Sequence, residues 1–143
     1  MGLILRLLVA AGLAADAVVH WRFAPQMAFV EGGSVHGDLL FRIQAGVAAV
    51  VAVIVLTYAA RWSYALAFLV AGSAVGALLL YYYVDVGALG PLPNMHEPVW
   101  YTEKTISLVG EGVATVAAAI GFLTVRRGRR GEAEYEREHA HLF

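Results

Sequence analysis

Three ionisable residues, Asp16, Arg42 and Glu111, lie inside long apolar runs of the sequence. A charged side chain in hydrocarbon costs several kcal/mol, so each of these residues is a candidate for function. His20 follows Asp16 by four positions, which places both side chains on one face of a helix. A carboxylate beside an imidazole is suited to proton transfer as acid and base. We therefore predict Asp16, His20 and Glu111 as the catalytic residues if the protein is an enzyme.

Arg42 is the cation that could neutralise one of these carboxylates, since all three charges are expected at a similar depth. Glu111 belongs to a polar stripe on one face of its helix, formed by Lys104, Ser107, Glu111 and Thr115. If Arg42 pairs with Asp16 or Glu111, the other carboxylate needs a second partner, such as His20 or a ligand. Two simpler interpretations stay open: the ion pairs only fix the register of the helices, or Arg42 extends to the membrane surface.

A wider group of polar and aromatic residues is expected near the same level. The residues of this group that could bind a ligand are Arg42, Tyr82, Asp85, Asn94, His96, Glu97, Trp100 and Tyr101. Imidazole and carboxylate also bind zinc, iron or copper. The residues that such a metal site could use are His20, His36, His96, Asp16, Asp85 and Glu97. No compact motif such as H-E-x-x-H joins them, so no metal ligand is assigned and the cofactor is left open.

Four apolar runs must position these residues, at about 3–21, 39–60, 65–84 and 105–125. Each has roughly the 20 residues that a helix needs to cross a hydrocarbon layer of about 30 Å. Hydrophobic residues make up 60% of the chain and charged residues 15%, against about 25% charged in soluble domains. Short connections force neighbouring helices to alternate in direction. The predicted fold is all-α, an integral membrane antiparallel four-helix bundle over residues 1–125 with a charged tail over 126–143.

The first run also carries the small-residue pattern of a signal peptide, Ala15-Asp16-Ala17. Its start is barely basic and an acid occupies the would-be cleavage position, so a retained helix is predicted. Orientation follows from the cations, because cytoplasmic flanks carry more lysine and arginine. Arg6, Arg61 and the arginines of residues 126–130 share one side. We therefore predict a multi-pass protein of the bacterial plasma membrane with both termini in the cytoplasm.

Two loops are predicted on the outer side, over residues 22–38 and 85–104. The second contains three of the four prolines of the chain, which keep it non-helical. Residues 61–64 are expected to form only a tight inner connection. Long ordered loops on a rigid scaffold often carry function, so the outer loops are expected to border the site.

The composition excludes several kinds of protein. The chain has no cysteine, which excludes disulfides, thiolate metal sites and iron–sulfur clusters. The net charge is -1 and the basic residues of the tail are nearly balanced by acids, which argues against nucleic acid as a partner. Neither a P-loop nor a strand–GxGxxG–helix motif is present, which argues against nucleotide chemistry.

The segment YYYVDVGALGPLPNMHEPVWYTEK, with DAVVHW near the first run, resembles small four-span bacterial membrane proteins. In size and helix layout the chain is also similar to the DoxX-like group. The resemblance covers the helical part of the chain. It implies a bacterial plasma-membrane protein built as a four-helix bundle, and it assigns no functional residues.

The leading hypothesis is a polar site in the outer half of the membrane that binds a lipid-soluble small ligand, such as a lipid, a quinone or another isoprenoid. An accessory subunit of a membrane complex would fit the same pattern. The alternative is a small membrane enzyme, an isomerase or cyclase of a lipophilic substrate, in which Asp16, Glu111 and His20 act as acid and base. The expected partners are the lipid bilayer, a lipophilic small molecule, and further copies of the chain or a larger membrane complex.

Overall fold

The computed structural model describes residues 1–140, except for the side chains of residues 126–133. The chain forms four helices: α1 (Gly2–Met27), α2 (Gly37–Thr57), α3 (Arg61–Tyr83) and α4 (Thr102–Ala140). Each is long and apolar enough to cross a membrane, α4 through its first part, Thr102–Val125. The prediction of an all-helical protein with four long apolar helices is confirmed. The predicted arginine cluster of residues 126–130 lies outside the described side chains.

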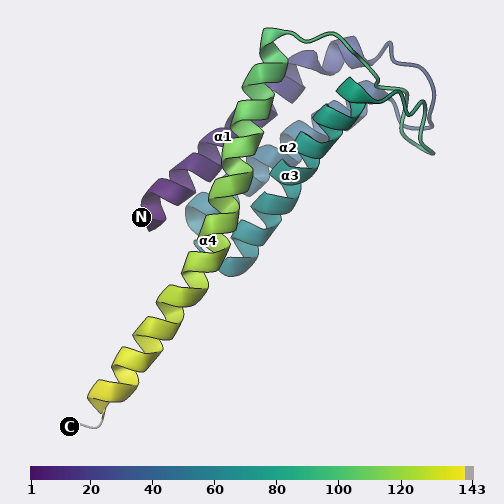
Figure 1. Cartoon of the computed structure of the whole chain (residues 1–143). Helices are drawn as coiled ribbons and strands as arrows, with labels where there is room; N and C mark the ends of the chain where they lie inside the picture. The colour runs from purple at the N-terminus through teal and green to yellow at the C-terminus, as the bar shows by residue number, and fades with distance from the viewer. Residues whose placement is uncertain (141–143) are drawn as a thin grey trace.

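The four helices pack against one another, and α4 extends beyond the other three (Figure 1). Helix α1 packs most extensively on α2 and α4, and α3 packs mainly on α4, whereas α2 and α3 touch each other less. The two long connections, residues 28–36 and 84–101, lie at one end of the molecule, which we call the loop end (Figure 1). They are joined there by two backbone hydrogen bonds, from Val35 N to Pro91 O (3.0 Å) and from Asn94 N to Glu31 O (2.8 Å).

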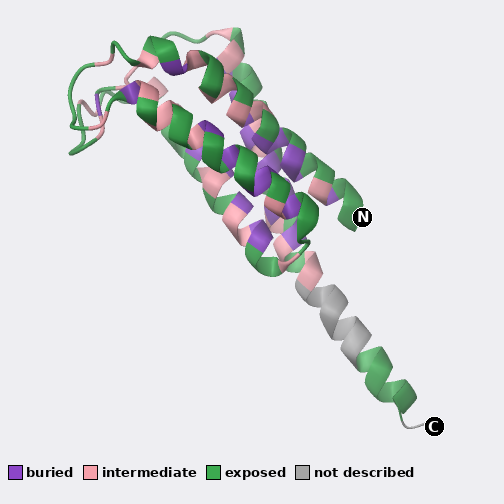
Figure 2. Cartoon of the chain, turned by 180° about the vertical axis from the view of Figure 1, so that it is seen from behind, coloured by how far each residue is buried: buried purple, intermediate pink, exposed green. Residues whose placement is uncertain are grey.

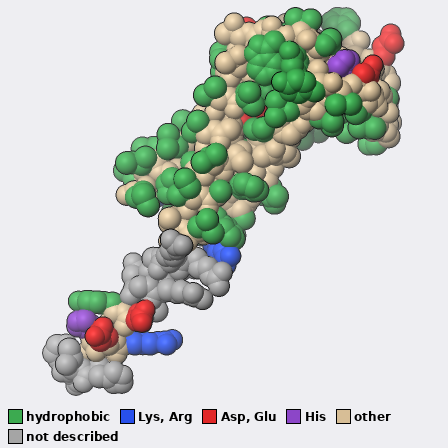
Figure 3. Space-filling view, viewed as in Figure 1, with side chains coloured by type: hydrophobic (Ala, Val, Ile, Leu, Met, Phe, Trp, Pro, Cys, Tyr) green, Lys and Arg blue, Asp and Glu red, His purple; other side chains and the backbone are tan. Residues whose placement is uncertain are grey.

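The core between the helices consists mainly of small residues. Its fully buried alanines include Ala48, Ala67, Ala71, Ala114 and Ala118. Small side chains allow helix backbones to approach closely, which is how helices pack in lipid. Many larger aliphatic residues are exposed instead, and Figure 2 shows exposed positions along the outer faces of the helices. On the face seen in Figure 3, hydrophobic side chains spread over the helical part, and charged groups gather near the loop end and along the extension of α4.

Three predicted boundaries are corrected by the structure. Helix α1 continues through Pro25 to Met27, so the first loop is shorter than predicted. Helix α3 begins at Arg61, so residues 61–64 are its first turn and not a connection. Helix α4 continues through the charged tail to Ala140. Hydropathy predicts only where a helix leaves an apolar layer. The helix itself continues through residues with high helix propensity, such as glutamate and arginine.

Ser63 explains why α3 begins earlier than the hydropathy indicated. Its Oγ accepts a hydrogen bond from Ala60 N (3.1 Å) and lies 2.5 Å from the backbone O of Tyr58, to which it donates. One side chain thereby satisfies polar backbone groups at the start of the helix. Residues 58–60 form the whole connection between α2 and α3.

Candidate functional site

Helices α1 and α4 bring Asp16, His20 and Glu111 together in one buried cluster. One oxygen or nitrogen atom from each residue lies within 4.8 Å of the others. Asp16 is 0% exposed and Glu111 is 1% exposed, while the His20 side chain is 18% exposed. The three residues predicted as a catalytic set from their spacing and depth are therefore neighbours in space.

Two further side chains hold this cluster in place. Gln44 of α2 donates a hydrogen bond from Nε2 to Oδ2 of Asp16 (2.8 Å). His20 Nδ1 lies 3.0 Å from the backbone O of Asp16 and 2.5 Å from its Oδ1. The imidazole also packs on Phe41, with the ring centres 4.7 Å apart. Contacts from α1 and α2 thus fix the Asp16 and His20 side chains.

One carboxylate oxygen in the cluster, Glu111 Oε2, is buried without a hydrogen-bond partner among the described residues, and Asp16 Oδ1 has only the imidazole of His20 beside it, with Nδ1 2.5 Å away. A buried polar atom that lacks a partner costs about 1–3 kcal/mol, and more if the group is charged. A bound group that donates hydrogen bonds or positive charge to these carboxylate oxygens would therefore stabilise the cluster.

Arg42 does not supply that group, and of the alternatives left open for it, the ion pair with Asp16 or Glu111 is not formed. The guanidinium is exposed and lies 5.5 Å from the centre of the Trp21 ring. Successive residues of a helix are separated by about 100° around its axis, so depth alone does not bring a side chain into a bundle. Phe41 and Gln44 occupy the inward positions of this turn of α2, and Arg42 lies on another face.

The cluster forms part of the wall of a cavity of about 510 Å³ between the four helices. His20, Gln44 and Glu111 line it from three different helices. Its apolar walls are formed by Val19, Phe23, Met27, Leu40, Phe41, Ala74, Ala77 and Leu78. Ligand cavities are typically about 300–1,000 Å³ and mostly apolar, with a few polar groups that orient the ligand. This cavity has the size and the lining of a small-molecule site.

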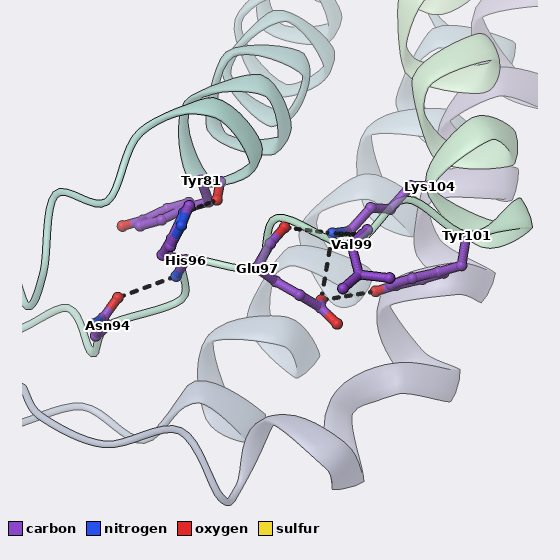
Figure 4. A network of polar contacts seen from close by, with 7 residues as sticks. All are labelled: Tyr81, Asn94, His96, Glu97, Val99, Tyr101 and Lys104. Carbon is purple, nitrogen blue, oxygen red and sulfur yellow. Dashed lines mark hydrogen bonds and ion pairs between the residues drawn. The ribbon is translucent and has the colours of Figure 1, made fainter.

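The second loop covers the loop end of the cavity and is held by Lys104 (Figure 4). Lys104 is buried, and its Nζ donates to the backbone O of Glu97 (2.9 Å) and of Val99 (2.6 Å). The same nitrogen lies 3.4 Å from Oε2 of Glu97. Since the ammonium is engaged by the loop, Lys104 serves to anchor this cover at the start of α4.

The loop is also tied to the end of α3 through Tyr81. The backbone O of Tyr81 accepts a hydrogen bond from Glu97 N (3.1 Å) and lies 2.7 Å from Nδ1 of His96. Asn94 Oδ1 in turn accepts a hydrogen bond from His96 N (3.1 Å). Figure 4 shows these contacts joining the loop to two helices. Asn94 and His96, predicted as ligand-binding residues, hold the loop in position.

The other predicted ligand-binding residues divide into two groups. Tyr82, Glu97 and Tyr101 line the cavity. Trp100 packs edge-on against Tyr82, with ring centres 4.9 Å apart, and donates from Nε1 to Thr105 Oγ1 (2.8 Å). Asp85 is exposed and accepts a hydrogen bond from Gly87 N (3.1 Å), so its carboxylate stabilises a turn.

The hydroxyl of Tyr101 stands where the loop meets α4. It donates to Glu97 Oε2 (3.3 Å), and the ring stacks on Phe23, with centres 5.7 Å apart. Burial of the phenol raises the pKa of Tyr101 to about 12, and the negative charges of Glu97 and Glu103 add to the effect. Tyr101 therefore remains a neutral hydrogen-bond donor at the mouth of the cavity across the physiological range.

The sequence interpretation missed the role of Gln44. An amide inside an otherwise apolar helix is costly unless it is paired, and that cost was a usable signal. The candidate metal site suggested from the sequence drew on three histidines, His20, His36 and His96. Among the described residues, only His20 joins acidic side chains at metal-binding separation, and its acidic neighbours are Asp16 and Glu111.

In comparisons with protein-family models, curated proteins and solved structures, nothing matches this chain, so its function is argued from the site itself.

Proposed function

We propose that the chain crosses the bacterial plasma membrane four times as an antiparallel bundle. The support is the length and apolarity of the four helices and the large aliphatic side chains on their outer faces. In water such a surface would drive aggregation, whereas in a bilayer it contacts lipid tails. The loop end faces outward and both termini lie in the cytoplasm, because Arg6, Arg61 and the four arginines of residues 126–130 outnumber the three cations near the loop end, which are Arg22, Arg42 and Lys104.

Single cysteines can test this topology, because the natural chain has none to interfere. Ser34 in the first loop and Ala59 in the α2–α3 connection are exposed positions at opposite ends. In intact cells, a membrane-impermeant maleimide should label Ser34→Cys and leave Ala59→Cys unlabelled until the cells are opened. Labelling of both in intact cells, or of Ala59→Cys alone, would contradict the proposed orientation.

Within this bundle, we propose that the cavity binds a lipid-soluble small molecule with its polar end at Asp16, His20 and Glu111. A lipid, a quinone or another isoprenoid has the required shape, with an apolar body for the walls and a polar end for the cluster. The observation that carries this proposal is a cavity of about 510 Å³ that adjoins two buried carboxylates, of which Glu111 Oε2 lacks a partner among the described residues. A ligand group at this point would compensate for the cost of burying them.

The test is native mass spectrometry of the chain extracted from membranes. Wild-type protein should carry one lipid-soluble molecule per chain. Ala77→Trp, which fills the cavity wall, should reduce its occupancy by about tenfold, equivalent to ~1.4 kcal/mol. Leu69→Trp is the matched control, because Leu69 is exposed on the same helix and does not line the cavity. Wild-type protein without a bound molecule, or equal occupancy in Ala77→Trp, would refute the binding function.

A membrane enzyme is the second candidate, and it is favoured by one observation: no arginine neutralises Asp16 or Glu111 among the described residues. A carboxylate free of such a partner can exchange a proton with a bound substrate. An isomerase or cyclase of this kind would exchange carbon-bound hydrogen of its substrate with the solvent. A bound molecule recovered from wild-type protein in D₂O should then contain carbon-bound deuterium, and one recovered from Glu111→Gln should not. Absence of deuterium in both would leave only the binding function.

A further inference from the structure

The cluster of Asp16, His20 and Glu111 contains two buried carboxylates and, among the described side chains, no lysine or arginine. Lys104 is the nearest buried amine along α4, but its Nζ is engaged by Glu97 and Val99 at the loop end. Arg42 is exposed and lies over Trp21. Two carboxylates in a low-dielectric interior need positive charge beside them, supplied by protons or by a cation. The fold places the two acids together without supplying that charge from the described side chains.

We propose that this cluster binds one divalent transition-metal ion of the zinc class. Asp16 and Glu111 each provide a carboxylate oxygen, and His20 provides an imidazole nitrogen. A divalent ion balances the charge of the two carboxylates, while the neutral imidazole adds none. Calcium and magnesium prefer sites made of oxygen alone, so the nitrogen ligand favours zinc or a neighbouring transition metal.

The separations of the three residues suit such an ion. Ligand atoms about 2.1 Å from a tetrahedral zinc lie about 3.4 Å from one another. The candidate atoms here lie within 4.8 Å of one another. Side-chain rotations that move these atoms by about 1 Å would bring them to the separation that zinc requires. The atoms available for this role are Glu111 Oε2, which has no partner among the described residues, and Asp16 Oδ1, which lies 2.5 Å from the His20 imidazole.

The surroundings of Asp16 also resemble the outer shell of a metal site. Gln44 donates to Oδ2 of Asp16, so the ion would bind the other oxygen, Oδ1, which lies beside the His20 imidazole. Such hydrogen bonds orient metal-binding carboxylates, and their loss typically lowers metal affinity by about 10–100-fold. His20 and Glu111 line the cavity. Three protein ligands thus leave a coordination position open toward it, as in catalytic rather than structural zinc sites.

Metal binding goes beyond the proposed binding of a lipophilic molecule and does not require it. It can be measured on purified, chelator-treated chain titrated with Zn²⁺ alone, and with Co²⁺ as a spectroscopic probe. Wild-type protein should bind one Zn²⁺ per chain, and the Co²⁺ form should show the visible absorption of a four-coordinate nitrogen–oxygen site. Asp16→Asn, His20→Ala and Glu111→Gln should each weaken Zn²⁺ binding by at least about 100-fold.

His36→Ala and His139→Ala are the controls, since one removes a histidine of the first loop that does not line the cavity and the other an exposed histidine of the α4 extension. Both should retain wild-type affinity for Zn²⁺. Circular dichroism reports whether each variant keeps its helices. Glu111→Gln serves as the second test if Asp16→Asn does not fold, and the Co²⁺ spectrum tests the wild-type chain without any substitution.

Wild-type protein that binds no Zn²⁺, or three cluster variants that bind it as tightly as the controls do, would overturn the metal site. Native mass spectra of the same preparations show separately whether a lipophilic molecule is bound, so the metal site and the proposed function are tested independently. A chain that holds a lipophilic molecule but no metal would refute only the inference made here.

Discussion

Gly12 of α1 and Gly110 of α4 face each other where the two helices cross, and neither position has room for a side chain. A Cβ atom on Gly12 would meet the backbone O of Gly110 and lie 2.8 Å from the Cβ of Ala114. A Cβ atom on Gly110 would lie 3.1 Å from that of Ala15. Asp16 is one helical turn after Gly12, and Glu111 is the residue after Gly110. This close backbone contact sets the separation of the two carboxylates.

Gly12→Ala is therefore expected to push α1 away from α4. Forcing a methyl group into a packed contact typically costs about 1–3 kcal/mol. The melting temperature in detergent should fall, and ligand occupancy should fall with it, because Asp16 moves with α1. Gly46→Ala on α2 is the control, since nothing lies within 4 Å of its added Cβ. An unchanged melting temperature for Gly12→Ala would show that the helices do not touch at this point.

Gln44→Leu should remove the hydrogen bond to Asp16 while keeping a side chain of similar size. Losing a hydrogen bond to a buried carboxylate is expected to cost about 1–2 kcal/mol in the free energy of unfolding. Gln26→Leu, at an exposed position of α1, should leave that free energy nearly unchanged. Equal stability of the two variants in reversible unfolding would mean that Gln44 does not support the cluster.

Lys104→Met should loosen the loop that covers the cavity. The substitution leaves the backbone oxygens of Glu97 and Val99 without the donor they share. Hydrogen exchange at the amides of Asn94 and Glu97 should become faster by at least about tenfold, since local opening governs exchange there. Arg22→Met changes an exposed cation of α1 and should leave these rates unchanged. No acceleration in Lys104→Met would exclude an anchoring role for the ammonium.

Tyr101 should titrate late and should link folding to alkaline pH. Its pKa in the folded chain is about 12, against an ordinary value of 10.0. The folded state holds this proton more tightly, so the stabilisation is complete below about pH 10 and is lost as the pH rises to about 12. The measurement is the phenolate absorbance of wild-type protein minus that of Tyr101→Phe. Glu97→Gln should shift the midpoint downward, and a midpoint near 10 in wild-type protein would contradict the burial of this phenol.

Hydropathy was sufficient to predict the four helices, because apolar length is a direct property of the sequence. It was a poor guide to helix ends. The first turn of α3 depends on Ser63 binding the backbone around Ala60, and the continuation of α4 depends on helix preference outside the apolar layer. Neither contribution appears in an average over apolar residues.

The candidate site was partly predictable for a similar reason. The four-residue spacing of Asp16 and His20 fixes their common face, and the depth of Glu111 places it at the same level. Depth did not reveal the direction of a side chain around its helix, so the alternatives for Arg42 stayed open and Gln44 was overlooked. The crossing at Gly12 and Gly110 was also missed, because the sequence does not show which glycines of two helices will face each other until the helices are packed.

A high-resolution structure of the chain in a lipid bilayer tests the central claim most directly. The claim predicts density for an ion or the polar end of a bound molecule about 2–3 Å from Asp16 Oδ1 and Glu111 Oε2, continuing into the cavity if a lipophilic molecule is present. A closed cavity, with the two carboxylates paired to Arg42 or to each other and no density beside them, would contradict it.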